Sequence, residues 1–339
     1  DLMNTLLQPD TRRQSSETGS DMVRRLYTSN LQTNNVAGLA ATLGSRIQTG
    51  KTLSELAGLG PYFFFSYPQF LGGLIVIDSN DRSQYNALQV QIERRVTAGY
   101  VQAAYTLSKS MDTRSFDPAF TTAATGNAQS ASSTPFDIKN RDLNWAPSDF
   151  DRRHAIQGSF SLELPFGHGK WIAGNASGAL DRILTGWNLA GTVTYTSGRP
   201  FTVYAGTNTL SNVVQTPANC SGCSPGLGSV FHAPTTGYIW FFDEADRAKF
   251  STPAPGEFSN VGRNYFIGPP SLNVNFSLAK RTRIVGGQTL EVRMDATNFL
   301  NQPTFGFPTA TLTSTTFGRI YNSVVSGSRK IQMGVKYYF

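Results

Sequence analysis

The sequence is poor in charged residues and has no long apolar run. Charged side chains make up 15% of the 339 residues, against about 25% in an ordinary soluble domain. The longest apolar stretch, FLGGLIVI at 70–77, is much shorter than the about 18 residues that a membrane-spanning helix needs. Lysine and arginine outnumber aspartate and glutamate by 29 to 22 but are scattered, which argues against a nucleic-acid partner. A helical membrane span is therefore excluded, whereas membrane-crossing strands are not.

Cysteine is also scarce. Only Cys220 and Cys223 are present, spaced as CSGC in a polar stretch rich in glycine and proline. A zinc site is disfavoured because no second CxxC and no histidine pair at zinc spacing accompanies them. A catalytic dithiol is disfavoured because it normally begins a helix in a βαβ unit, which is absent. A local disulfide in an oxidising compartment is favoured, with free thiols as the alternative. We expect no metal and no cofactor.

Alternation of apolar and polar residues is the main positive signal. Aromatic residues reach 12%, and 32 glycines with 17 prolines indicate many strands joined by loops. A period of two recurs in seven segments, which predicts strands with two unlike faces. The segments are 85–95, 99–110, 154–164, 187–195, 272–278, 290–295 and 330–339.

The apolar faces of these segments carry no charge. About thirty positions fall on them, and none is lysine, arginine, aspartate or glutamate. Lipid-facing strands would show this pattern, because a lysine or arginine costs about 2–4 kcal/mol at the bilayer midplane and about 0–1 kcal/mol near its edge. Basic residues continue the apolar face only at segment ends. They are Arg94, Lys109, Arg199 and Lys280.

Every second connection between the segments is long. The long ones cover 109–152, 200–270 and 300–328, and the shorter ones 96–99, 165–186 and 282–288. In an up-and-down sheet alternate connections lie at the same end, as in outer-membrane barrels with short periplasmic turns and long external loops. A soluble sandwich or adhesin-like surface domain is the alternative, because its strands also have one apolar face. The sequence thus predicts an all-β fold, an antiparallel up-and-down transmembrane β-barrel with long extracellular loops.

Aromatic residues gather near the strand ends that this topology assigns to the periplasm. An interfacial girdle would group them in this way, although any one of them could be an ordinary core residue. They are Tyr100, Phe166, Trp171, Trp187, Tyr337 and Phe339.

Candidate functional residues fall into two groups. Charges on the polar faces would point into the lumen, where they would pair across strands or bind water, or else hold a plug or line a substrate path. These are Glu93, Glu163, Glu291, Arg293 and Asp295. Aromatics on the external loops are candidate ligand contacts, with packing of the loops as the alternative. These are Tyr204, Tyr238, Trp240, Phe241, Phe242 and Tyr265.

The run DFDRRH at 149–154 concentrates charge just before the third strand. It could suggest acid–base chemistry or anion capture, but no nucleophile and no paired general base complete a catalytic site. We favour a network of ion pairs at the barrel rim. No enzymatic activity is expected of the chain.

Six stretches together resemble the C-terminal part of a TonB-dependent outer-membrane receptor, of the Oar-like type that carries a carboxypeptidase-regulatory-like domain. They occur in the expected order over 61–339. They are YNALQVQIERRVTAGYVQAAYTLSKSMD, DFDRRHAIQGSFSLELPFGHGK, GWNLAGTVTYTSGRPFTV, VGRNYFIGPP, LEVRMDATNFLNQPTFG and KIQMGVKYYF.

The resemblance implies a barrel of about 22 strands closed around a plug. This chain would supply the C-terminal third, with seven strands or up to ten if 68–78 and 315–322 add more. Residues 1–84 would be an external loop region and 85–339 the barrel strands with their loops. The opening DLMNTLLQPDTRRQ has neither a starting methionine nor a leader pattern, so we interpret the chain as a fragment without plug and coupling box. Within the first region, the capping box from Thr52 to Glu55 predicts a short helix that ends near Gly58.

The implied function is active uptake of a ligand across the outer membrane, with an oligosaccharide, a peptide or a siderophore-like compound as the cargo. A passive porin is an alternative. Implied partners are outer-membrane lipid, TonB through the plug, and the barrel-assembly machinery. That machinery reads a terminal aromatic preceded by apolar residues at alternate positions, and the matching residues here are Ile331, Met333, Val335, Tyr337 and Phe339.

Overall fold

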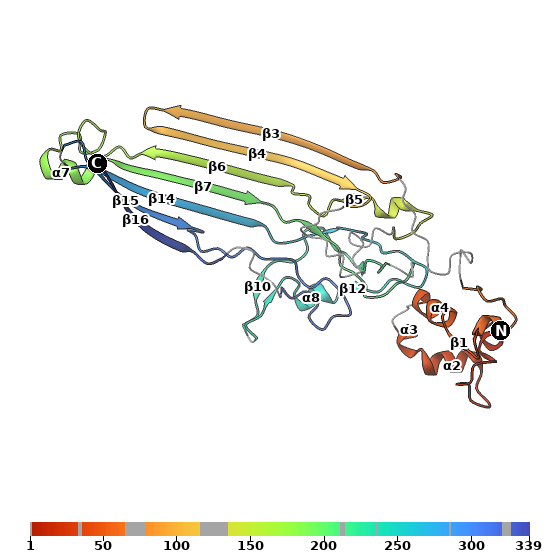
Figure 1. The fold of residues 1–339 in the computed structure, drawn as a ribbon. Coiled ribbons are helices and arrows are strands. Elements are labelled where there is room, and N and C mark those ends of the chain that lie inside the picture. Colours follow the sequence, from red (N-terminus) through yellow and green to blue (C-terminus); the bar gives the residue numbers. More distant parts are fainter. Residues whose placement is uncertain are drawn as a thin grey trace.

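A sheet of seven long antiparallel strands dominates the computed structural model (Figure 1). The structure describes residues 2–32, 36–64, 79–115, 135–210, 214–234, 236–284, 286–320 and 327–339. All seven predicted strands are present. They are β3 (Ser83–Val96), β4 (Gly99–Asp112), β6 (His154–Glu163), β7 (Trp187–Thr196), β14 (Ser271–Arg283), β15 (Thr289–Thr297) and β16 (Lys330–Tyr338).

The sheet is a simple meander. Its order is β16-β15-β14-β7-β6-β4-β3, so every long strand lies beside its neighbours in the chain, and the short β5 (Ala146–Pro147) adds to β4. The connections 97–98, 164–186 and 284–288 therefore lie at one end, here called the turn end. The connections 113–153, 197–270 and 298–329 lie at the other, the loop end (Figure 1). The predicted sorting of long and short connections is confirmed.

The pairing register places the apolar positions of all seven strands on the same side. One cross-strand row illustrates this alignment, because it joins an apolar or small residue from six strands and reaches a basic residue only at the end of β3. The row is Ile331, Ala296, Phe276, Gly191, Phe160, Val101 and Arg94. Residues on alternate positions form the opposite, polar face.

Strand ends at the turn end are staggered across the sheet. Val96, the last residue of β3, shares a cross-strand row with Met333, which lies five residues before Tyr338 at the end of β16. Five residues over six strand steps, at about 3.3 Å per residue and about 4.8 Å per strand, correspond to a tilt of about 30°. Strands of membrane barrels are tilted by about 35–45°, so the stagger approaches that of a barrel wall.

The apolar face of the sheet is exposed. Ile92, Met333 and Val335 are 66%, 76% and 69% exposed, and neither core cluster found among the described residues contains a side chain from the seven strands. A soluble sandwich would bury this face under a second sheet. Within the described ranges β3 and β16 are not paired with each other, so the sheet is open and both of its edges are unpaired.

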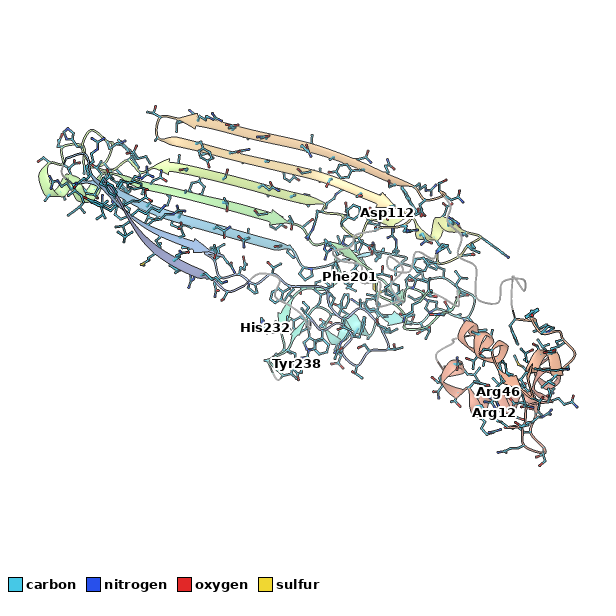
Figure 2. All side chains as sticks on the ribbon, viewed as in Figure 1. Arg12, Arg46, Asp112, Phe201, His232 and Tyr238 are labelled. Carbon is cyan, nitrogen blue, oxygen red and sulfur yellow. A yellow bond between two sulfur atoms is a disulfide. The ribbon has the colours of Figure 1, made fainter. Side chains whose placement is uncertain are left out.

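The main core lies in the loops. Two long connections, 197–270 and 298–329, pack together around a cluster of phenylalanines, one of which is labelled in Figure 2. Six of its members are Phe201, Phe241, Phe242, Phe250, Phe266 and Phe317. Short elements frame the cluster: β8 (Pro200–Phe201), β9 (Asn219–Cys220), β10 (Phe231–His232), β11 (Ile239–Trp240), α8 (Glu244–Arg247), β12 (Phe250–Ser251) and β13 (Phe266–Ile267).

The two additional strands considered from the sequence are not supported where they can be assessed. Residues 315–320 form no strand, and Arg319 makes only an isolated bridge to Trp240. The remaining positions 321–322 and the other segment, 68–78, lie outside the described residues.

The N-terminal region forms a helical unit with its own core. The predicted helix is confirmed as α5 (Leu53–Leu56), whose cap Thr52 accepts a hydrogen bond from the Glu55 backbone N–H. The rest of the unit was not predicted: α1 (Leu2–Leu7), α2 (Gly19–Leu26), α3 (Thr28–Gln32), α4 (Val36–Gly44), β1 (Ile47–Gln48) and β2 (Lys51–Thr52). Its core includes Leu6, Leu7, Met22, Leu43 and Leu53. Among described helices, which also include η2 (Arg141–Asn144) and α7 (Gly178–Leu184), none is long and apolar enough to cross a membrane.

Candidate functional site

The polar face of the sheet is the first candidate surface. All five charged residues predicted for it lie on it, by the strand registers. Each of their carboxylates has a cationic partner. The pairs are Arg281–Glu291 at 2.6 Å, Arg293–Asp295 at 2.7 Å, Arg95–Glu93 at 2.9 Å and Lys170–Glu163 at 3.1 Å. Pairing keeps these charges compatible with a partly enclosed polar surface.

Charge on this face is concentrated toward the turn end. On β7, by contrast, no position on the polar face is charged. These positions are Asn188, Ala190, Thr192, Thr194 and Thr196. Amide and hydroxyl groups both donate and accept hydrogen bonds. On the middle strands β6, β7 and β14, the polar face beyond Glu163 and Arg281 is therefore neutral and carries mostly hydrogen-bonding side chains.

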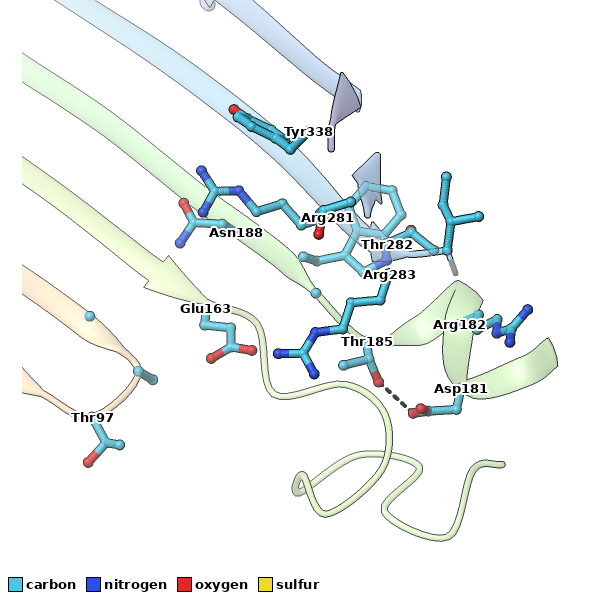
Figure 3. A pocket seen from close by; sticks show the side chains of 16 residues that line it. Thr97, Glu163, Asp181, Arg182, Thr185, Asn188, Arg281, Thr282, Arg283 and Tyr338 are labelled. Atoms are coloured by element: carbon cyan, nitrogen blue, oxygen red, sulfur yellow. Dashed lines mark hydrogen bonds between the residues drawn. The ribbon is translucent and has the colours of Figure 1, made fainter. Parts of the chain in front are cut away.

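A cavity of about 1030 Å³ opens at the turn end of the polar face (Figure 3). Arg182 from α7 lines it together with Arg281 and Arg283 of β14, and Glu163 contributes one carboxylate. The second carboxylate, Asp181, accepts hydrogen bonds from the Thr185 hydroxyl at 2.5 Å and the His168 backbone N–H at 2.7 Å. These bonds, that of Thr185 foremost, lower the pKa of Asp181. The cavity is lined by three guanidinium groups and two carboxylates, so it carries a net positive charge.

The loop aromatics predicted as ligand contacts separate into buried and accessible residues. Phe241 and Phe242 are buried in the loop core, so they pack the loops together, which is the alternative that the sequence left open. Tyr204 is half-buried, and its backbone bonds to Ala310 and Leu312 of the neighbouring long loop. Tyr265 is also half-buried, and its hydroxyl donates to the Cys223 carbonyl at 2.9 Å. These four residues chiefly stabilise the loops.

The other two predicted aromatics, on β11 and the turn before it, stack against arginine side chains. Tyr238, labelled in Figure 2, is 45% exposed, and the Arg319 guanidinium lies 3.2 Å from its ring centroid. Trp240 is half-buried beside Arg247, at 4.5 Å. Stacked arginine and aromatic side chains present both a flat apolar surface and hydrogen-bond donors. Ligand contact stays a prediction for Tyr238 and Trp240.

A buried ion network at the loop end escaped prediction from the sequence. Arg263, fully buried, donates to the carboxylates of Asp112 and Asp149, the latter at 3.2 Å, and to the carbonyls of Asp112 and Asn144. Asn264 donates to the same Asp149 carboxylate at 2.6 Å. The rim network expected around DFDRRH therefore exists, but its central cation comes from the distant VGRN stretch.

The rest of the DFDRRH run also contacts neighbouring strands. The Asp151 carboxylate accepts a bond from the Ser110 backbone N–H, yet burial raises its pKa. Arg152 donates to the Ser197 carbonyl at 2.6 Å. His154 bonds with the Tyr105 hydroxyl at 2.9 Å. Each of these groups has a structural partner at the junction of loop and sheet.

Comparison with known families agrees with this architecture. A family model described as an outer membrane beta barrel domain matches residues 17–332, nearly the whole chain. The chain belongs to this family. It is an outer-membrane β-barrel protein. No curated protein and no solved structure matches it.

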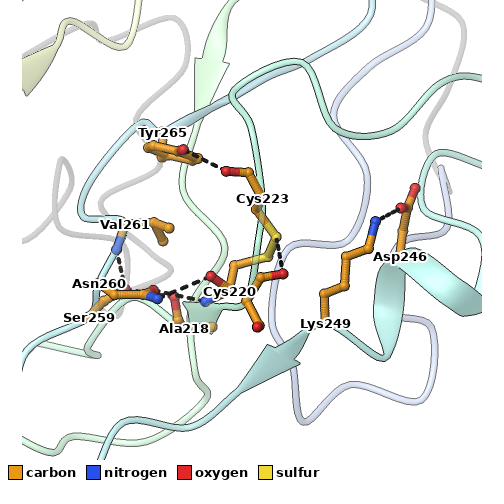
Figure 4. Close-up of a disulfide and its surroundings, with 10 residues drawn as sticks. Ala218, Cys220, Cys223, Asp246, Lys249, Ser259, Asn260, Val261 and Tyr265 are labelled. Carbon is orange, nitrogen blue, oxygen red and sulfur yellow. Dashed lines mark hydrogen bonds and ion pairs between the residues drawn. A yellow bond between two sulfur atoms is a disulfide. The ribbon is translucent and has the colours of Figure 1, made fainter.

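The two cysteines of this barrel protein form a disulfide, the pairing that the sequence favoured (Figure 4). Cys220 is buried in the loop core, and Asn260 brackets its backbone by accepting from the Cys220 N–H at 2.9 Å and donating to the Cys220 carbonyl at 3.1 Å. The disulfide therefore fixes one corner of the loop core. Among the residues that the structure describes, no group of three or more histidine, cysteine, aspartate or glutamate side chains is placed to hold a metal ion.

The final strand of the barrel sheet carries the predicted terminal pattern on its apolar face. Ile331, Met333, Val335 and Tyr337 pair in register with Ala296, Met294, Val292 and Leu290 of β15. Phe339 follows the strand at the turn end, fully exposed, with its ring 6.3 Å from that of Tyr337. Both rings lie at the level where β15 begins.

Proposed function

We propose that this outer-membrane protein is part of a TonB-dependent receptor that takes up a ligand actively. The observation that supports it best is that one sheet carries a packed loop region at one end and a polar face that leads away from it. At the loop end, two long connections build a packed external region that carries the exposed Tyr238 and the half-buried Trp240. From the loop end toward the turn end, the polar face carries first neutral hydrogen-bonding groups and then paired charges. A ligand captured outside would meet a continuous polar wall.

The same proposal sets the orientation in the membrane. The apolar face lies against lipid, because it is exposed and uncharged across the middle of the sheet. The turn end lies in the periplasm and the loop end outside the cell. The barrel-assembly machinery recognises the terminal strand, and TonB acts through a plug inside the barrel. The chain carries out no covalent chemistry.

Uptake assays on cells that produce the full-length receptor test this function. Labelled oligosaccharides, short peptides and ferric siderophores are supplied to matched strains with and without TonB. We expect accumulation of one class that stops when TonB is removed. Uptake that persists without TonB would identify a passive porin. Surface binding without any uptake would identify an adhesin-like protein.

A further inference from the structure

The connection 164–186 is the longest at the turn end, and its helix exposes apolar side chains. The other two connections there cover only 97–98 and 284–288. Within α7, Leu180 is 56% and Ile183 is 62% exposed. Neither belongs to a core cluster in the described part of the chain. A short turn could join β6 to β7 without a helix, so the exposed apolar side chains of α7 require an explanation.

The helix has two different sides. Leu180 and Ile183 are three residues apart and therefore share one side. Asp181 projects about 100° around the helix from Leu180 and about 200° from Ile183, at 3.6 residues per turn. Asp181 faces the cavity that Arg281 and Arg283 also line, and its carboxylate accepts the hydrogen bond from the Thr185 hydroxyl there (Figure 3). The apolar side of α7 therefore points away from the lumen side of the sheet.

The C-terminal end of α7 is bonded to the apolar face. The Trp187 indole N–H donates to the Ile183 carbonyl at 2.9 Å, and the Lys280 ammonium donates to the Thr185 carbonyl at 2.5 Å. Trp187 and Lys280 are register partners on that face, with the ammonium 5.3 Å from the ring centroid. Tryptophan and lysine are the side chains that anchor proteins at the boundary between lipid and water. The apolar side of the helix thus continues the apolar face of the sheet.

We propose that α7 is a membrane-interface helix that lies on the periplasmic leaflet, with Leu180 and Ile183 inserted among phospholipid acyl chains. The proposal rests on the membrane orientation given under the proposed function. Phospholipid is the occupant because the exposed side chains adjoin the apolar face and carry no charge. A plug or another periplasmic protein would instead approach from the cavity side, where Asp181, Arg281 and Arg283 lie. Short amphipathic helices bind interfaces in this manner.

Nitroxide spin labels on the full chain in phospholipid vesicles test the inference. Labels are placed singly through Leu180→Cys, Ile183→Cys and, as the matched control on the cavity side of the same helix, Asp181→Cys. Collision with oxygen, which partitions into lipid, is compared with collision with a water-soluble nickel chelate. Positions 180 and 183 are expected to show a several-fold higher oxygen-to-nickel ratio than position 181.

Two reference labels separate this inference from the proposed function. Val193→Cys reports the apolar face and Thr194→Cys the polar face of β7. If the oxygen-to-nickel ratios at positions 193 and 194 do not differ, the membrane orientation itself is wrong. If they differ but positions 180 and 183 match position 181, α7 lies in water and the inference alone is overturned. Low accessibility to both reagents at 180 and 183 would show that protein, rather than lipid, covers the helix, which also overturns it.

Discussion

Arg263 is a buried charge in the loops that several acceptors hold. Its guanidinium joins the end of β4, the segment before β6 and the segment before β14. A planar group with five donors can reach several acceptors at once, which a lysine cannot do. Arg263 therefore fixes how two long connections, 113–153 and 197–270, leave the sheet.

Substitution of Arg263 tests this role. Arg263→Met leaves Asp112 and Asp149 buried without their cation, and loss of one partner of a buried ion pair costs about 3–5 kcal/mol. We expect the free energy of unfolding in urea to fall by that amount and the external loops to become protease-sensitive. The control is Asp142→Asn, which removes an exposed ion pair with Arg82 and should change stability by about 0–1 kcal/mol. Equal effects of the two substitutions would contradict the assigned role.

Asp10 gives the N-terminal helical unit a dependence on pH. Burial opposes its ionisation, but hydrogen bonds from the Arg12 side chain and backbone and from Arg46 prevail and hold its pKa at about 2 (Figure 2). The folded pKa lies below the unfolded value of 3.8. Asp10 therefore stabilises the unit above pH 4 by about 2 kcal/mol, and this contribution is lost as pH falls toward 2.

Hydrogen exchange of the full chain measures this effect. Protection of the amides in 2–64 should fall between pH 4 and pH 2, after correction for the intrinsic exchange rate. Asp10→Asn should reduce protection at pH 6 and flatten the pH dependence. Some dependence will remain, because hydrogen bonding to Arg25 also lowers the pKa of Glu17 to about 2. An unchanged profile in the variant would exclude Asp10 as the titrating group.

At the scale of elements, strands could be predicted from the sequence and the helical unit could not. When the two faces of a strand meet different surroundings, apolar and polar residues alternate in its sequence. This alternation is clear in all seven segments. Helices α1 to α4 have only five to nine residues, and helices this short depend on tertiary packing. Arg263 and Asp112 are 151 residues apart, so no local pattern could reveal their contact.

The Cys220–Cys223 disulfide is expected to stabilise the loops modestly. Cys220 and Cys223 enclose only two residues, and a ring this small restricts the unfolded chain by about 2 kcal/mol at most. Cys220→Ala with Cys223→Ala should lower the melting temperature of the loop region by a few degrees. Outer-membrane levels of this variant should match those of the parent, because the core cluster that contains Cys220 includes no described side chain from the seven strands. A fall in membrane levels would contradict that separation.

The terminal strand is expected to act during assembly. Deletion of Phe339 removes the last aromatic of the alternating pattern, and we expect the amount of protein in the outer membrane to fall several-fold. Tyr338→Ala is the matched control, because Tyr338 lies on the polar face one position out of the pattern. Quantitative immunoblots of outer-membrane fractions compare the two. Equal levels for both variants would show that Phe339 is not part of the signal.

For the whole molecule, the apolar face has the height of a bilayer. Trp187 and Tyr195 lie on this face of β7, eight residues apart, near its two ends. Eight residues span about 27 Å along the strand, which a tilt of about 30° reduces to a height of about 23 Å. The apolar band of outer-membrane barrels is about 25 Å tall. Lys280 pairs with Trp187 at the turn-end boundary of this band, where a cation can reach water.

A charge placed in the middle of this band tests the assignment of both faces at once. Val193→Arg puts a guanidinium against lipid and should destabilise the folded protein in vesicles by about 2–4 kcal/mol. Thr194→Arg, one position along β7, puts the same group on the polar face and should cost far less. Urea unfolding in phospholipid vesicles, monitored by tryptophan fluorescence, gives both values. The reverse order would show that the polar face, rather than the apolar one, meets the membrane, because only the lipid-facing side penalises a charge by its depth.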